Sequence, residues 1–302
     1  MSATAAPSRF PMGLRYMAIG AFFFSLMSVC VKLASRHLPS SHTVLARGVV
    51  TLVLSIGVLF ARRPRRPLRE MLGHDKPRLV LRGFAGFVAL NCFYYAIKNM
   101  PLADATVIQY SSPVFTALFA AIFLGETMRR VEIVCMALSF AGVLLVAQPS
   151  FLFDHASSTP PLTFAIAIAG AIISAIAYTT IRRLRKTDHA DVIVLYMPLV
   201  AMPLSIPAVA RDATMPAPVE WLLLLGIGVT TQIAQMFMTK ALVSEPAGRA
   251  TAVSYLQVAF AYAWGLLIFG ETPNALGILG ALVVAVATIG IALFKQPVAP
   301  SA

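Results

Sequence analysis

The stretch AIKNMPLADATVIQYSSPVFTALFAAIFLGET, residues 96–127, returns in altered form as ALVSEPAGRATAVSYLQVAFAYAWGLLIFGET, residues 241–272. Aligned at a constant offset of 145 residues, the two stretches share nine identical positions in 32. Chance supplies about two or three identities in a composition this biased. Convergence of apolar sequence explains matching alanines, but not a Gly-Glu-Thr that recurs at the same end of both stretches. The recurrence predicts an internal duplication.

Apolar residues dominate the sequence around this repeat. They make up 59% of the 302 residues, and charged residues make up 12%, against about 25% in a typical soluble domain. Ten runs have the length that a helix needs to cross a bilayer, and in hydrocarbon a helix satisfies its own backbone hydrogen bonds. The sequence therefore predicts an all-α polytopic membrane protein with ten transmembrane helices, at 14–35, 42–60, 79–99, 103–124, 131–148, 162–181, 192–210, 220–240, 249–269 and 274–294.

The duplication divides these helices into two sets of five. We expect a first five-helix repeat over 14–148 and a second over 162–295, joined by an extracytoplasmic linker over 149–161. Residues 1–13 and 296–302 then form short cytoplasmic tails. Because five is odd, the second repeat must enter the membrane from the side opposite to the first.

The distribution of lysine and arginine tests this inversion. With the N-terminus in the cytoplasm, the cytoplasmic segments hold 19 basic residues and the opposite side holds four, as the positive-inside rule expects. The connection between the second and third spans carries eight basic residues, whereas its counterpart, 211–220, carries one. Equivalent loops have exchanged their charge. This exchange predicts inverted repeats in the inner membrane, with both termini cytoplasmic.

Several classes of function lack support in the sequence. The net charge of +12 lies in short blocks between apolar runs, so we expect a lipid bilayer as partner and no nucleic acid. No metal, nucleotide or nucleophile motif occurs in a usable context, so we expect no cofactor, no metal and no enzymatic activity. Acidic residues lie at span ends or between spans, which leaves no visible proton relay within the membrane. Proton coupling and oligomeric state stay open.

Polar side chains within the spans are the candidate site residues. Amides and hydroxyls in hydrocarbon must find partners, so the helix faces that carry them should point inward. Two interpretations stay open: helix–helix hydrogen bonds, worth about 0.6–2 kcal/mol each, or the lining of a substrate cavity. The candidates for the cavity are Asn91, Tyr94, Gln109, Ser112, Tyr178, Gln232, Gln235, Ser254, Tyr255, Gln257 and Trp264.

Four charged residues are candidates for gates or anchors. Arg47 lies inside the second span, where it has three possible roles: a structural anchor, a gate ion pair, or a contact with an anionic substrate group. For Glu126 and Glu271, at the ends of their spans, we favour capping or gating contacts over ion coupling. Coupling to protons is either absent or uses groups at span ends such as Asp104.

The two copies differ at one helix-breaking position. Pro113 removes a backbone hydrogen bond inside the fourth span, so we expect a kink there. Its counterpart in the ninth span is Val258, so we expect the halves to differ at this point. Gly125 and Gly270 are expected to end their helices.

The repeated segments resemble the drug/metabolite transporter superfamily, specifically the EamA-type ten-helix permeases. The resemblance covers about 14–295 and implies two five-helix halves that transport a small organic molecule. Similar proteins export amino acids or drugs, or take up metabolites such as S-adenosylmethionine or riboflavin. The residues that carry it are Tyr94-Tyr95-Ala96, Pro101-Leu102-Ala103-Asp104-Ala105-Thr106, Leu124-Gly125-Glu126, Pro246, Ala250-Thr251, Phe269-Gly270-Glu271 and the pair Arg47-Gly48.

Inverted repeats also have a mechanical consequence. Two halves related by a pseudo-two-fold axis in the membrane plane can exchange conformations, which changes the side that is open. The sequence predicts a secondary transporter that works by alternating access, with a midplane cavity formed chiefly by spans 1, 3, 4, 6, 8 and 9. We expect export of an amino acid or a related amphipathic metabolite. Metabolite uptake is the alternative, and a channel or membrane scaffold is the rival outside this class.

Overall fold

The computed structural model describes residues 11–34, 40–61, 70, 72–153, 160–209, 216–270 and 274–293, and this part of the chain is helical without strands. Ten candidate spans occur in it, which confirms the predicted fold class. The helices are α1 (Met12–Ala34), α2 (Ser40–Ala61), α4 (Lys76–Asn99), α5 (Leu102–Gln109), α6 (Ser112–Leu124), α7 (Arg130–Ala147), α8 (Ser150–Phe153), α9 (Pro161–Leu184), α10 (Ala190–Val209), α11 (Pro218–Ser244), α12 (Ala247–Val253), α13 (Leu256–Phe269) and α14 (Ala275–Leu293).

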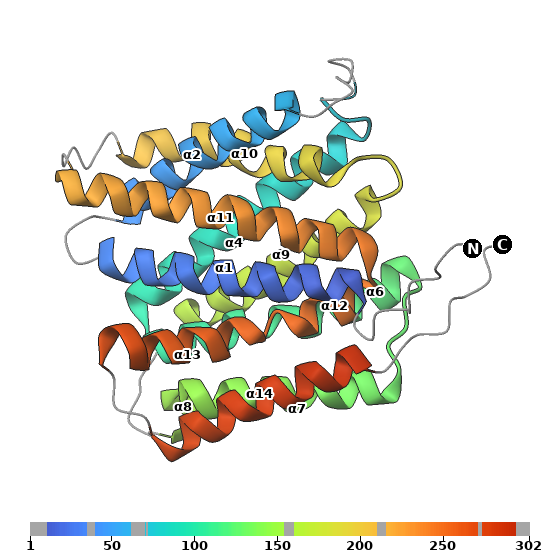
Figure 1. Ribbon diagram of the computed structural model, residues 1–302, viewed down its shortest axis with the longest axis vertical. Coiled ribbons are helices and arrows are strands. Elements are labelled where there is room, and N and C mark those ends of the chain that lie inside the picture. Colours follow the sequence, from blue (N-terminus) through green and yellow to red (C-terminus); the bar gives the residue numbers. More distant parts are fainter. Residues whose placement is uncertain are drawn as a thin grey trace, which may run out of the picture.

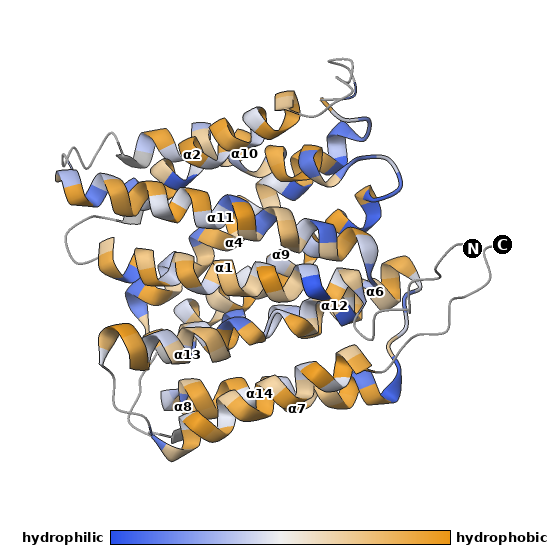
Figure 2. Ribbon diagram, in the orientation of Figure 1, coloured by the Kyte–Doolittle hydropathy of each residue, from blue (hydrophilic) through white to orange (hydrophobic). Residues whose placement is uncertain are grey.

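The outer surface of the bundle is apolar. Leu222, Leu267 and Val286 are 70%, 77% and 68% exposed, and hydrophobic residues cover most of each helix while hydrophilic ones concentrate towards the helix ends (Figure 2). A soluble protein does not expose this much contiguous apolar surface. The surface therefore suits a hydrocarbon environment.

The direction of the helices shows the inversion. In Figure 1, α2 ends and α4 begins at the end of the bundle where α1 begins and α14 ends, whereas α10 ends and α11 begins at the opposite end. The end of the second span and the end of the seventh, its counterpart, thus lie on opposite sides. Two repeats of the same topology, inserted in opposite senses, require this arrangement.

The two halves interleave instead of forming separate domains. Helix α1 packs on α11, and its counterpart α9 packs on α4. Helix α2 pairs with α10, α7 pairs with α14, and the contact of α6 with α9 is matched by that of α13 with α1. Exchanging the halves leaves this set of contacts unchanged, as a pseudo-two-fold axis requires.

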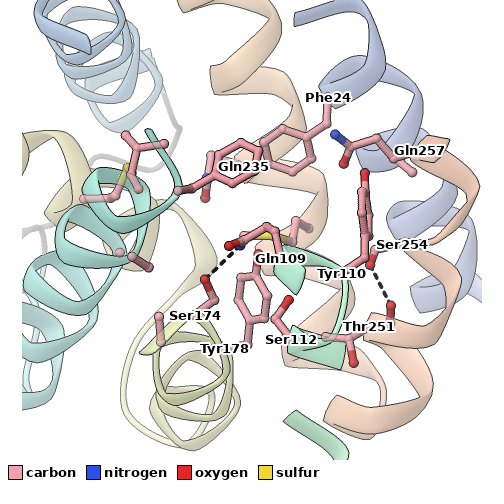
Figure 3. A pocket seen from close by; sticks show the side chains of 18 of the residues that line it. Phe24, Gln109, Tyr110, Ser112, Ser174, Tyr178, Gln235, Thr251, Ser254 and Gln257 are labelled. Atoms are coloured by element: carbon pink, nitrogen blue, oxygen red, sulfur yellow. Dashed lines mark hydrogen bonds between the residues drawn. The ribbon is translucent and has the colours of Figure 1, made fainter. Parts of the chain in front are cut away.

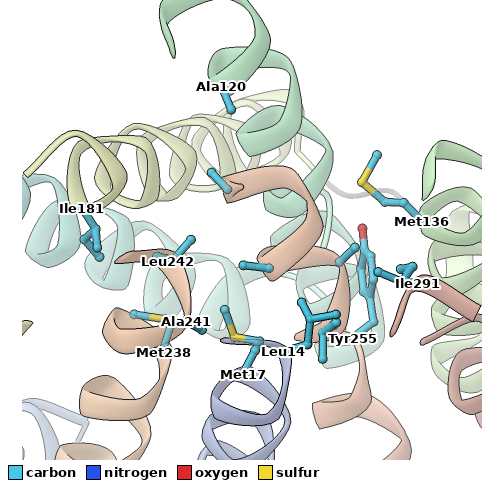
Figure 4. Packing of buried hydrophobic residues seen from close by; sticks show 14 of the residues in the cluster. Leu14, Met17, Ala120, Met136, Ile181, Met238, Ala241, Leu242, Tyr255 and Ile291 are labelled. Atoms are coloured by element: carbon cyan, nitrogen blue, oxygen red, sulfur yellow. The ribbon is translucent and has the colours of Figure 1, made fainter. Parts of the chain in front are cut away.

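Close approaches and a buried apolar cluster hold the interleaved helices together. A Cβ atom added to Gly142 of α7 would lie 2.7 Å from the carbonyl oxygen of Gly280 of α14, and one added to Gly280 would lie 2.6 Å from the carbonyl oxygen of Gly142. The backbones therefore touch where neither residue has a side chain. The apolar cluster combines residues of both halves, among them Leu14 of α1, Met136 of α7 and Tyr255 at the start of α13 (Figure 4).

Two spans are interrupted near their middle, and here one expectation is wrong. The fourth span consists of α5 and α6, and the ninth consists of α12 and α13. Tyr110 and Tyr255, identical in the two copies, lie in the two breaks. The halves therefore do not differ at this point, although only one of them has the proline.

A serine explains the break that lacks a proline. The Ser254 hydroxyl donates to the Thr251 carbonyl oxygen at 2.6 Å, and the Ser254 backbone N–H bonds to the same oxygen at 3.0 Å. This local bonding tightens the last turn of α12 and competes with the regular helical pattern. In the first copy, Pro113 has no N–H to continue the pattern, and the Ser111 hydroxyl donates to the Ile108 carbonyl oxygen at 2.6 Å.

The repeated Gly-Glu-Thr ends a helix in both halves, as expected. Gly125 follows α6 with φ of 66°, and Gly270 follows α13 with φ of 63°. This left-handed conformation strains any residue with a Cβ atom, so glycine suits both positions.

Candidate functional site

A cavity of about 200 Å³ lies between the two halves, near the middle of the long helices. Its residues come from spans 1, 3, 4, 6, 8 and 9, with Arg47 added from α2 and Met197 from α10. Figure 3 shows labelled side chains from both halves converging on it. The polar residues that line it are Arg47, Arg82, Gln109, Tyr110, Ser112, Ser174, Tyr178, Gln235, Thr251, Ser254 and Gln257.

Arg82 is a cavity residue that the charge count assigned to the cytoplasmic side. Helix α4 begins at Lys76, and the Asp75 side chain caps it by accepting from the Arg78 backbone N–H at 3.3 Å. The predicted span, 79–99, already contained Arg82, and the start three residues earlier places Arg82 further from the helix end. The side chain is buried, with 2% of the residue exposed, and its Nη2 donates to Gln235 Oε1 at 2.9 Å. Asp75 followed by Lys76-Pro77 is the sequence signal that predicts the earlier start.

Arg47 approaches the same region from α2. It is buried, with 7% exposed, and its guanidinium group is within electrostatic reach of the hydroxyl groups of Tyr94 and Tyr178. Tyr178 also interacts with Arg82, and the two arginines interact with each other. Among the described residues, neither arginine forms a salt bridge with a carboxylate.

The interrupted spans supply further polar groups. Gln109 and Ser112 flank the break between α5 and α6, and Ser254 and Gln257 flank the break between α12 and α13 (Figure 3). Gln109 Nε2 donates to the Ser174 hydroxyl of α9 at 3.1 Å. The first turns of α6 and α13 thus lie at the cavity, where the positive ends of the helix dipoles favour polar or anionic ligands.

Five of the predicted cavity residues do not line this cavity. Asn91 is exposed on α4 and donates to the Phe87 carbonyl oxygen at 2.8 Å. Gln232 is buried against α2 and donates to the Ser55 hydroxyl at 2.9 Å. Sequence alone shows that an amide lies within a span, but the facing helix decides whether it meets a cavity, a neighbour or lipid.

The other three of these residues are aromatic. Tyr94 reaches Arg47 without lining the cavity. Tyr255 is fully buried in the apolar cluster, beside the rings of Tyr110 and Phe140. Trp264 donates through Nε1 to the Ser25 hydroxyl at 3.0 Å and stacks edge-on with Phe22.

The charged candidates at the span ends make contacts of their own. Asp104 accepts from the backbone N–H of Ser150 at 2.6 Å and from its hydroxyl. Glu126 accepts from Arg182 Nε at 2.6 Å and from the Ala247 backbone N–H at 2.8 Å, which caps α12. Glu271 lies outside the described residues.

A second buried ion pair joins the halves at the same end. Arg249 of α12 lies 3.2 Å from Glu132 of α7, and both side chains are almost wholly buried. Arg249 also bonds to Glu245 at 3.3 Å and to the Ile291 carbonyl oxygen at 3.2 Å. Burial raises the pKa of the Glu245 carboxyl, although Arg249 and Arg182 oppose this shift. Arg182 and Arg249 entered the charge count as cytoplasmic, and the structure buries them among acidic partners.

A match to a known protein family covers nearly the whole chain. The EamA-like transporter family matches residues 11–148 and 162–293, one copy for each half. The chain belongs to this family. It is therefore a multi-pass membrane protein of a transporter family.

Individual relatives agree with this assignment. The pseudopaline exporter CntI of Pseudomonas aeruginosa is 33% identical over 94% of this chain and 97% of its own length. The human solute carrier family 35 member G1 is 30% identical over 94% of this chain and 80% of its own length. A solved crystal structure superposes with a TM-score of 0.82 at 16% identity, over 93% of this chain and 96% of the other, and this likeness concerns the fold alone.

Proposed function

We propose that the EamA-family protein is a secondary transporter that moves a small organic metabolite by alternating access. An amino acid or a related amphipathic compound is the substrate class, export is the direction, and the protein performs no catalysis. The observation that carries the proposal is the cavity between the halves, lined by polar groups from both. A site at the junction of inverted repeats suits a substrate that must be presented to either side.

The size and lining of the cavity support a small substrate. Its volume of about 200 Å³ is below the roughly 300–1,000 Å³ of pockets for drug-sized ligands. Amides, hydroxyls and guanidinium groups alternate there with the apolar side chains of Phe24, Phe93 and Met238. The printed function of the Pseudomonas aeruginosa relative, an exporter, supports export.

The charge bias and the buried ion pairs support the mechanism. Both termini are proposed to lie in the cytoplasm of a cell with the protein in its inner membrane, because basic residues favour that side. The pairs Glu126–Arg182 and Glu132–Arg249 join the halves at the end that would face the cytoplasm. They would keep the cavity closed on that side, and transport would require them to separate.

Transport measurements in vesicles of both orientations test the proposal. Inside-out and right-side-out vesicles are given a panel of labelled amino acids, nucleosides and vitamins, with and without a pH gradient. We expect saturable uptake of an amino-acid-like substrate into inside-out vesicles. Uptake confined to right-side-out vesicles would contradict export, and rates that never saturate would indicate a channel.

Two amide substitutions connect transport with the cavity. Gln109→Ala removes a polar group from the lining, and we expect substrate affinity to fall roughly 2- to 10-fold, the value of one hydrogen bond. Asn91→Ala removes an exposed amide outside the cavity and is the matched control, with unchanged transport expected. If Gln109→Ala transports normally at equal membrane abundance, this cavity does not bind the transported substrate.

A further inference from the structure

Two buried cations that line the cavity have no acidic partner in the part of the chain that the structure describes. Arg47 and Arg82 are 7% and 2% exposed, both line the cavity, and their like charges repel each other. A buried charge that lacks a partner is costly, so proteins normally pair it. The described salt bridges leave both arginines out: Glu126, Glu132 and Glu245 pair with Arg182 or Arg249, Asp75 pairs with Arg78, and Asp188 pairs with His74. The cavity therefore carries positive charge that the protein leaves uncompensated.

The guanidinium group of Arg82 has an unused donor. Its Nη2 donates to Gln235, while its Nε is buried and has no hydrogen-bond partner among the described residues. Nε and an Nη group on one edge of a guanidinium are the pair that binds a carboxylate in bidentate fashion. A ligand that satisfies this donor must itself be an acceptor.

We propose that the cavity binds its substrate through a carboxylate group held by Arg47 and Arg82. The inference rests on the proposed transport function and narrows it to small carboxylic acids, amino acids included. Gln235 and Tyr178 are positioning residues: the amide oxygen of Gln235 holds one edge of the Arg82 guanidinium, and Tyr178 interacts with both arginines. An amine alone has no acidic partner here, because no described acidic residue lines the cavity.

Gly86 makes room for this arrangement. A Cβ atom at Gly86, one turn after Arg82 on α4, would lie 2.7 Å from Arg82 Nη1. The missing side chain lets the guanidinium group fold against its own helix beside the cavity. Because the obstructing atom would be the end of a flexible side chain, Gly86→Ala moves the guanidinium group without a clash between backbones.

Ligand-induced thermal stabilisation of the purified full chain tests the charge preference. The probes are glutamate, succinate, the uncharged diamide succinamide, the diamine putrescine and inorganic phosphate. We expect glutamate or succinate to raise the melting temperature, and succinamide and putrescine to leave it unchanged. Equal stabilisation by the diamide or the diamine overturns the proposal, as does stabilisation by phosphate alone or by none of the probes.

Gln235→Glu is the sharpest variant, because it places a carboxylate 2.9 Å from Arg82 in the absence of ligand. We expect a higher melting temperature without ligand, because the new carboxylate pairs with the Arg82 guanidinium group. We also expect at least a tenfold loss of affinity for carboxylate ligands, because they must then compete with the introduced side chain for Arg82. Gln232→Glu, one turn earlier on α11, contacts Ser55 and no arginine. That control should lower the melting temperature. Undiminished carboxylate affinity in Gln235→Glu overturns the proposal.

Milder variants separate binding from folding. Arg82→Gln and Gly86→Ala should both weaken carboxylate binding, with Gly86→Ala keeping the melting temperature of the unliganded protein. Arg183→Gln changes an exposed arginine at the end of α9 and should bind as the parent does. Unchanged binding in Arg82→Gln overturns the proposal.

The two proposals fail in different ways. If vesicles transport an uncharged metabolite and Arg82→Gln transports it normally, the carboxylate site is refuted while transport stands. If carboxylates bind with the expected dependence on Arg82 and no vesicle transports them, the binding site stands and the transport function is refuted.

Discussion

Buried ion pairs at one end of the bundle connect residues from opposite halves. Arg182 lies in the last turn of α9 and contacts Glu126, the residue after Gly125. It also donates to the Val243 carbonyl oxygen at 2.7 Å. Such a pair contributes little over an apolar replacement, but loss of one partner strands the other charge. The main effect of these pairs is therefore to determine which helix ends contact each other. Their net contribution to the free energy of unfolding is small.

The first prediction concerns the loss of one partner. Arg182→Ala should lower the free energy of unfolding by about 3–5 kcal/mol, because the Glu126 carboxylate stays behind in a half-buried site. The Glu126→Gln/Arg182→Gln double variant should recover part of this loss. Chemical unfolding in detergent measures both, with Arg183→Ala, its exposed neighbour, as control. Equal stability of the Arg182 and Arg183 variants would contradict a buried pair.

The second prediction concerns pH. Burial raises the pKa of Glu245, so the folded protein holds that proton more tightly than the unfolded chain does. Ionisation of Glu245 therefore costs folding free energy as the pH rises above the ordinary glutamate range. Glu245→Gln removes this cost, and its melting temperature relative to the parent should increase between pH 4 and pH 8. A difference in melting temperature that stays constant between pH 4 and pH 8 would contradict the raised pKa of Glu245.

At the scale of helices, glycines determine how closely the last spans of the two halves can approach. Helices α7 and α14 are equivalent elements in the two repeats, and their backbones meet at Gly142 and Gly280. In a membrane, helix association depends on close van der Waals packing, because lipid removes the hydrophobic driving force between helices. Small residues at the crossing point therefore set the geometry of this pair.

The third prediction uses this crossing. Gly280→Ala places a methyl group against a carbonyl oxygen of α7 and should cost about 1–3 kcal/mol through overpacking. Gly57→Ala is the matched control, since nothing lies within 4 Å of its added Cβ atom. There the better helix propensity of alanine should stabilise the protein by up to about 1 kcal/mol. If Gly280→Ala melted at a higher temperature than Gly57→Ala, the close contact of α7 and α14 at Gly142 and Gly280 would be contradicted.

At the scale of the whole molecule, the two halves make equivalent helix–helix contacts, so exchanging them leaves the set of contacts unchanged. Each half supplies equivalent helices to the cavity, but the side chains are not equivalent: Arg82 and Gln235 lie on α4 and α11, which correspond to each other in the two repeats. The backbone is therefore nearly symmetric around a chemically asymmetric site. In the proposed alternating-access mechanism, such a site would keep one set of ligand contacts while the surrounding halves exchange conformations.

The fourth prediction concerns the membrane sides. Cysteines introduced at 61–78 and at 211–220, each in a chain freed of its own cysteines, should react with a membrane-impermeant reagent from opposite compartments. The 61–78 positions should react from the cytoplasm, together with tags on both chain ends. Reaction of both stretches from the same compartment would refute the inverted insertion.

Much of the fold followed from the sequence because its determinants are local. Hydropathy over about 20 residues defines a span, and the Gly-Glu-Thr repeat revealed the duplication. The orientation from the counts of lysine and arginine stays a prediction. Helix breaks were less predictable: Pro113 is visible in the sequence, whereas the break beside Ser254 depends on a hydroxyl that bonds to its own backbone.

The sequence by itself determined ten spans, two inverted copies and the presence of polar residues within them. Only the tertiary structure decided which of these residues meet. Arg82 is 153 residues from Gln235 in the chain, and Gln232, three positions before Gln235, contacts Ser55 instead. The physical reason is that burial and pairing depend on the facing helix, which in this interleaved bundle usually belongs to the other half.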